Sequence, residues 1–120
     1  MRAGKRSPHR AFPHVVLFCA MTLAGGFAHA QQEHRCAKSA LAQAPKLLEF
    51  HFGPDNRIEI RNAVKVLAPM RNPANAKQTF DVLEVWGFIY KGSYRMRFIY
   101  ARMPGDCMLM GQEIMEHASL

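Results

Sequence analysis

The chain has 120 residues, which is room for one small domain, and its 16 Lys and Arg against 9 Asp and Glu give a net charge of +7. Four basic residues, Arg2, Lys5, Arg6 and Arg10, precede every acidic residue, so the chain after residue 30 carries only about +3. This smaller charge removes the compositional argument for a nucleic-acid partner. Any inference about a partner must come from where the remaining charged residues lie.

The first thirty residues have the layout of a secretory signal peptide. The basic residues lead into an apolar run from Val15 to Phe27, and small residues stand at Ala28 and Ala30. This run is shorter than the roughly twenty residues that a membrane-spanning helix needs. We therefore predict a signal peptide over 1–30, cleavage near Ala30, and a mature chain in the periplasm or outside the cell without a transmembrane segment. An uncleaved membrane anchor is the alternative.

Residues 31–120 are predicted to form a single domain with two cysteines, Cys36 and Cys107, because Cys19 lies in the signal. Two cysteines in an oxidising compartment most simply pair, so we predict a disulfide between them. The alternatives are that both cysteines are free thiols or that both are metal ligands. The spacing of His and Cys does not match a structural zinc site, and we predict neither a metal nor a cofactor.

The mature chain is predicted to begin with a helix over 33–44, rich in Ala, Leu, Gln and Lys and ended by Pro45. One stripe of this helix collects the residues that would face a core: Cys36, Ala40, Leu41 and Ala44.

Alternating apolar residues predict short strands over 46–52, 57–61 and 64–68, the first two joined by a turn at 53–56. The segment 69–77 has two prolines and no apolar period, and it is predicted to be a surface loop. Beyond residue 106, a last strand is predicted over 107–118, with Gly111 as a candidate bulge.

The hairpin 79–103 is the strongest strand pattern in the chain, and its turn at 91–93 decides which residues share a face. A two-residue loop groups aromatic and basic residues on one face: Trp86, Phe88, Tyr90, Arg95 and Arg97. A three-residue loop moves the two arginines to the aliphatic face. We favour the two-residue loop, because it separates charge from the aliphatic residues.

These elements predict an α+β fold, with one N-terminal helix packed on an antiparallel β-meander of about four to six strands. The layout resembles small uncharacterised exported proteins of Gram-negative proteobacteria, through the signal peptide and the CAKSALAQAP and WGFIYKGSYRMRFIY stretches. The resemblance implies a periplasmic or secreted location. It carries no assigned activity and therefore no functional residue.

No catalytic constellation appears, so the sequence favours a binding or interaction module over an enzyme. The aromatic and basic face would be its ligand-binding surface, with a protein or an anionic glycan as ligand. The alternative interpretation is purely structural: Arg95 and Arg97 only cover a solvent-exposed sheet face with their side chains. The alternative functions are a small periplasmic hydrolase that pairs Glu84 with a second carboxylate, and a structural homodimer without a ligand.

Overall fold

The computed structural model describes Gly4, Ala11, Pro13 and residues 32–117, so most of the predicted signal peptide and its cleavage site lie outside the described residues. The chain divides into two units at Ala30, and residues 31–120 make up the second. The second unit contains the elements of the fold: α1 (Ala37–Phe52), β1 (Ile58–Val66), β2 (Met70–Asn72), β3 (Asn75–Ile89), β4 (Gly92–Ala101) and β5 (Leu109–His117).

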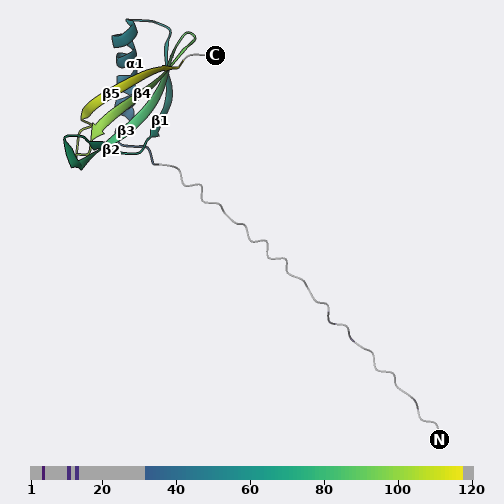
Figure 1. Ribbon diagram of the computed structural model, residues 1–120. Helices are drawn as coiled ribbons and strands as arrows, with labels where there is room; N and C mark the ends of the chain where they lie inside the picture. Colours follow the sequence, from purple (N-terminus) through teal and green to yellow (C-terminus); the bar gives the residue numbers. More distant parts are fainter. Residues whose placement is uncertain (1–3, 5–10, 12, 14–31, 118–120) are drawn as a thin grey trace. The chain divides into compact units, whose positions relative to one another are not determined.

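The strands form one antiparallel sheet in the order β1-β3-β4-β5, and β2 pairs with the first part of β3. The helix precedes the strands and crosses one face of the sheet (Figure 1). This arrangement confirms the predicted α+β fold and its meander. Among the described residues, no helix has the length and apolar character needed to cross a membrane.

Helix α1 continues past Pro45 to Phe52, so the predicted stop at Pro45 is wrong. A proline inside a helix costs about 3 kcal/mol, because it lacks an N–H and crowds the preceding turn. Beyond it, Leu47 and Leu48 are both buried, and each fully buried leucine stabilises the fold by about 1.5–3 kcal/mol. Burial of the two leucines therefore outweighs the proline.

The strand predicted over 46–52 is consequently also wrong. Its apolar alternation is incidental, because Phe50 is 83% exposed on the last turns of the helix. The two strands predicted over 57–61 and 64–68 are one strand, β1, with a bulge between Ile60 and Val64. The predicted loop over 69–77 is on the surface as expected, but it forms a short hairpin between β2 and the start of β3.

The core lies between the helix and the sheet face that it covers. Small residues, Ala37, Ala40 and Ala44, occupy the first half of the buried helix stripe. They let the helix approach large sheet residues, of which Met96, Phe98 and Tyr100 are almost fully buried.

The turn between β3 and β4 is the two-residue loop Tyr90-Lys91, because Ile89 pairs with Gly92. The predicted two-residue loop was Lys91-Gly92 or Gly92-Ser93, so the observed loop lies one or two residues earlier. The favoured grouping of faces is nevertheless confirmed, since Trp86 pairs directly with Arg95.

A disulfide joins Cys36, at the start of the helix, to Cys107, before β5, with the two Cα atoms 5.6 Å apart. The predicted pairing is confirmed. At the same end of the domain, Arg35 donates hydrogen bonds to the carbonyl oxygens of Met103 and Gly105. The helix start is thereby held to the connection between β4 and β5.

Candidate binding face

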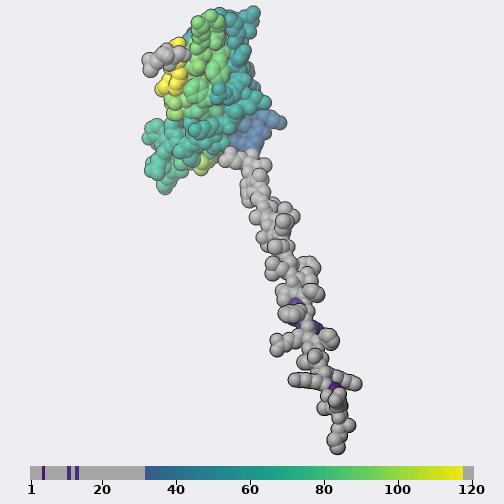
Figure 2. Space-filling model, turned by 90° about the vertical axis from the view of Figure 1, so that its right-hand side faces the viewer, coloured from purple at the N-terminus to yellow at the C-terminus, as the bar shows by residue number. Residues whose placement is uncertain are grey.

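The sheet face opposite the helix is uncovered toward the Tyr90-Lys91 turn, and we name this surface the open face. Strands make up most of the surface in Figure 2, where the blue start of the helix shows only at a margin. The register places on this face side chains from four strands: Glu59 and Lys65 of β1, Glu84, Trp86 and Phe88 of β3, Arg95 and Arg97 of β4, and Glu113, Met115 and His117 of β5. Arg61 of β1 joins them through its contact with Phe88.

Four of the five residues predicted as a binding surface, Trp86, Phe88, Arg95 and Arg97, share the open face. The fifth, Tyr90, is the first loop residue and is 73% exposed. It continues the line of Trp86 and Phe88 beyond the end of β3. The three rings form a row, which we call the aromatic row, along the middle of the face and its turn.

Glu84 is the charged residue at the centre of the open face, and only 7% of it is exposed. Its Oε2 lies 3.4 Å from Nε of Arg97, directly across the strand pair, and 3.9 Å from Nε of Arg95. The indole Nε1 of Trp86 donates to Oε1 at 3.3 Å. A carboxylate so buried needs these partners. The arginines are therefore partly neutralised within the protein.

Two further guanidinium groups reach the aromatic row from the β1 side of β3, opposite to β4. Arg61 of β1 lies over the ring of Phe88 at 5.2 Å from its centroid, and Arg57 lies over Tyr90 at 5.7 Å. The ammonium group of Lys91 is 5.4 Å from the Tyr90 centroid. Sequence reasoning missed these cations, because the register of β1 against β3 depends on its bulge. Only the alternation of Arg57 and Arg61 along their run hinted at them.

Arg57 is not a free cation. Its side chain donates two hydrogen bonds to Asp55, at 2.9 and 2.7 Å, and these lower the pKa of Asp55 to about 2. The same ion pair raises the pKa of Arg57. Among the described residues Arg61 forms no ion pair, which makes it the guanidinium beside the aromatic row with its charge open to a ligand.

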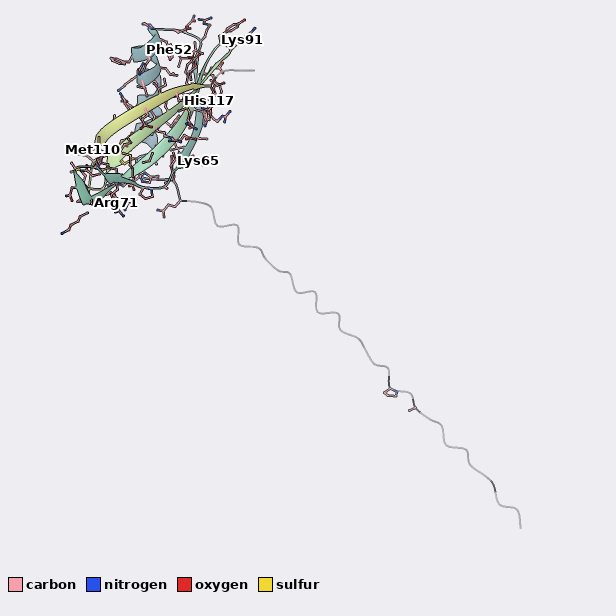
Figure 3. The ribbon with its side chains drawn as sticks, in the orientation of Figure 1. Phe52, Lys65, Arg71, Lys91, Met110 and His117 are labelled. Carbon is pink, nitrogen blue, oxygen red and sulfur yellow. A yellow bond between two sulfur atoms is a disulfide. The ribbon has the colours of Figure 1, made fainter. Side chains whose placement is uncertain are left out.

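The ring of His117 packs on Trp86, with centroids 4.8 Å apart and planes at 55°. Within the described part of the chain, the buried Nε2 of His117 has no hydrogen-bond partner. Figure 3 places His117 toward the same end of the domain as Phe52 and Lys91, whereas Arg71 and Met110 lie toward the opposite end. The packing of His117 on Trp86 therefore covers one face of the indole ring.

A shallow hollow of about 450 Å³ lies toward the β2 end of the open face. Its floor is apolar, with contributions from Leu67, Met70 and Ile99, and Arg97 and Glu113 stand at its rim. The open face therefore combines an apolar depression with an aromatic and charged area.

The hollow does not bring Glu84 together with a second carboxylate. Glu84 is absent from the lining of the hollow that contains Glu113, and its oxygens already accept from Trp86 and Arg97. The partner of Glu84 is thus the cross-strand arginine Arg97 rather than a second carboxylate. In the described part of the chain, no three His, Cys, Asp or Glu residues gather where they could hold a metal ion.

No protein-family model, curated protein or solved structure matches the chain. The resemblance to small exported proteobacterial proteins therefore stays a prediction. The chemistry of the open face is the basis on which a function can be argued.

Proposed function

We propose that the protein is an exported protein-binding module whose partner contacts the open face. The observation that carries this proposal is the aromatic row, in which Tyr90 is exposed and Trp86 and Phe88 are half-buried, on a sheet whose other face is closed by the helix. Aromatic residues and arginine are the types that most often dominate the energy of protein interfaces.

The charge balance of the open face favours a protein over an anionic glycan. In the row that crosses the sheet at Glu84, the cations Lys65 and Arg97 alternate with Glu84 and Glu113, and Glu84 accepts from Arg97. A densely anionic ligand would face Glu84 and Glu113 as well as the arginines. A protein partner presents both charges and apolar side chains, which also suits the hollow beside Arg97.

The backbone of Tyr90 supports the same proposal. Its φ of 53° lies in the left-handed region, which costs a non-glycine residue about 1–2 kcal/mol. Turns of this kind ordinarily use Gly or Asn there. A strained conformation that holds an exposed ring outward is a feature typical of functional sites.

The test is site-specific photocrosslinking in cells that express the full chain. A photoreactive phenylalanine at Tyr90 is expected to give a discrete adduct with a partner, and replacement of Trp86 and Arg61 by Ala is expected to abolish it. The matched control is the same photoreactive residue at Phe50, an exposed aromatic position on the helix. Equal adducts from both positions, or an adduct that survives the double replacement, would contradict the proposal.

The exported location is part of the proposal, and the disulfide between Cys36 and Cys107 supports it, because such bonds persist in oxidising compartments. Mass spectrometry of the purified protein tests it separately. The expected N-terminus is near Gln31, and a chain that keeps residues 1–30 and stays in the cytoplasm would exclude export.

A further inference from the structure

β5 is an edge strand whose last seven residues lack the usual protection against pairing. Natural sheet edges are blunted by lysine, proline or bulges. β5 contains neither lysine nor proline; its pairing with β4 shifts register between Leu109 and Gly111 and is regular from Gly111 to His117. The opposite edge, β1, is irregular in its middle, between Ile60 and Val64, and carries Lys65. The sheet therefore offers one long regular stretch of edge, residues 111–117 of β5.

Exposed apolar side chains gather along the β5 edge. Met110 and Met115 are 50% and 52% exposed, and Met108 and Leu109 beside them are also exposed. Methionine is enriched at interfaces, where its unbranched side chain adapts to a partner. The edge thus offers both free backbone groups and apolar surface to another strand.

We propose that a second copy of this chain pairs with β5 through its own β5, antiparallel and about a two-fold axis at Ile114. Ile114 is the midpoint of the regular segment from Gly111 to His117, so this register pairs all seven residues of that segment. An axis at Glu113 would set that carboxylate against its own copy. A two-fold contact also closes at two copies, which avoids open-ended stacking.

The charges along this register are complementary. It places Glu113 of the second copy opposite Met115, and Nη2 of Arg95 already lies 3.2 Å from Sδ of Met115. Among the described residues Glu113 forms no ion pair, so its carboxylate is free for the Arg95 of the second copy. The two-fold axis repeats this pair on the other side. The contact uses the β5 edge rather than the aromatic row. The dimer can therefore be tested independently of the proposed function.

Sedimentation equilibrium of the purified protein at micromolar concentration tests the pairing. The expected mass is twice that of one chain. Glu113→Arg, which sets two arginines against each other, and Met115→Lys, which adds an edge lysine, are each expected to weaken the dimer about tenfold or more. Glu59→Arg makes the same charge change at an exposed glutamate of the β1 edge and is expected to leave the dimer intact.

Both β5 variants replace exposed side chains, and their near-ultraviolet circular dichroism is expected to match the wild type. A wild-type protein with the mass of one chain at these concentrations would overturn the inference. So would a dimer that Glu113→Arg and Met115→Lys leave unchanged, or one that Glu59→Arg weakens as much as they do.

Discussion

Leu48 of the helix packs directly over Gly87 of β3, where a Cβ atom would lie 2.7 Å from Cδ1 of Leu48. The same added atom would lie 2.9 Å from Cε of Met96. The missing side chain of Gly87 is therefore what allows Leu48 to be completely buried. This contact fixes how closely the last turns of the helix approach the sheet.

Replacement of Gly87 is expected to overpack this contact. Gly87→Ala should lower the free energy of unfolding by about 1 kcal/mol, because the ends of Leu48 and Met96 can shift, and Gly87→Val by about 3 kcal/mol. Urea denaturation measures both values. Gly111→Ala on β5 is the control, since its added Cβ makes an ordinary contact with Ile99 at 3.4 Å. Equal losses at the two glycines would contradict the account of helix packing.

Removal of the disulfide is expected to cost more. The bond between Cys36 and Cys107 spans 71 residues, for which chain entropy predicts a contribution of about 4 kcal/mol. The double variant Cys36→Ala and Cys107→Ala should lose this amount in urea denaturation. Reductant should lower the stability of the wild type to the same level and leave the double variant unchanged. A double variant as stable as the oxidised wild type would contradict this prediction.

The strain at Tyr90 predicts opposite effects on stability and binding. Tyr90→Asn places a residue that tolerates the left-handed region in the turn, so stability should rise by up to about 1 kcal/mol. Loss of the ring should weaken binding to the partner identified by crosslinking, measured with the purified proteins. Lys91→Asn, at the neighbouring loop position, is the control and should not raise stability. A Tyr90→Asn variant that binds like the wild type would remove Tyr90 from the binding face.

Asp81 predicts a dependence of stability on pH. Burial alone would raise its pKa, but hydrogen bonds from Arg102, at 2.7 Å, and His34, at 3.2 Å, hold that pKa below the ordinary value. The stabilisation is therefore complete above the ordinary aspartate pKa of about 4 and is lost as pH falls through the lowered pKa. Nδ1 of His34 accepts the N–H of Cys36, which leaves Nε2 to donate to Asp81.

Asp81→Asn is the matching variant. It should lower the free energy of unfolding by about 1 kcal/mol at pH 7, because the charged hydrogen bonds become neutral ones. The difference from the wild type should shrink below pH 4, as Asp81 itself becomes protonated. Denaturation curves at pH 7 and pH 3 measure this. A difference that grows toward pH 3 would have the wrong sign for the proposed interaction.

The fold class was predictable because it depends on local patterns. Alternation along 79–103 identifies the central strands. Trp86 and Arg95 share a face because the loop has two residues rather than three, wherever in the turn those two residues lie. The helix end was not predictable in this way. Local propensity stops the helix at Pro45, whereas the buried Leu47 and Leu48 continue it. Tertiary packing is invisible to a pattern read along the chain.

The residues of the candidate site also fall into those that a local pattern predicts and those that depend on tertiary structure. Residues of the β3–β4 hairpin were found, because one turn relates them. Arg61 over Phe88 was missed, since it depends on a bulge in a strand distant in sequence. The position of Tyr90 in the turn was also missed, because a large aromatic residue is an unusual choice for a left-handed loop position.

The two faces of the sheet carry separate sets of constraints. The main buried cluster and the disulfide both involve the helix side, whereas Arg61, Phe88 and Ser93 lie on the other side toward the Tyr90-Lys91 turn. Exposed positions at the turn end of the open face can therefore change in combination while the packing beneath the helix stays the same. Glu84 and the buried cluster of Phe80, Val82, Ile99 and Ala101 lie outside that set. The domain is accordingly suited to laboratory selection of new binding proteins, with the exposed positions at the turn end of the open face randomised on a small, disulfide-linked scaffold.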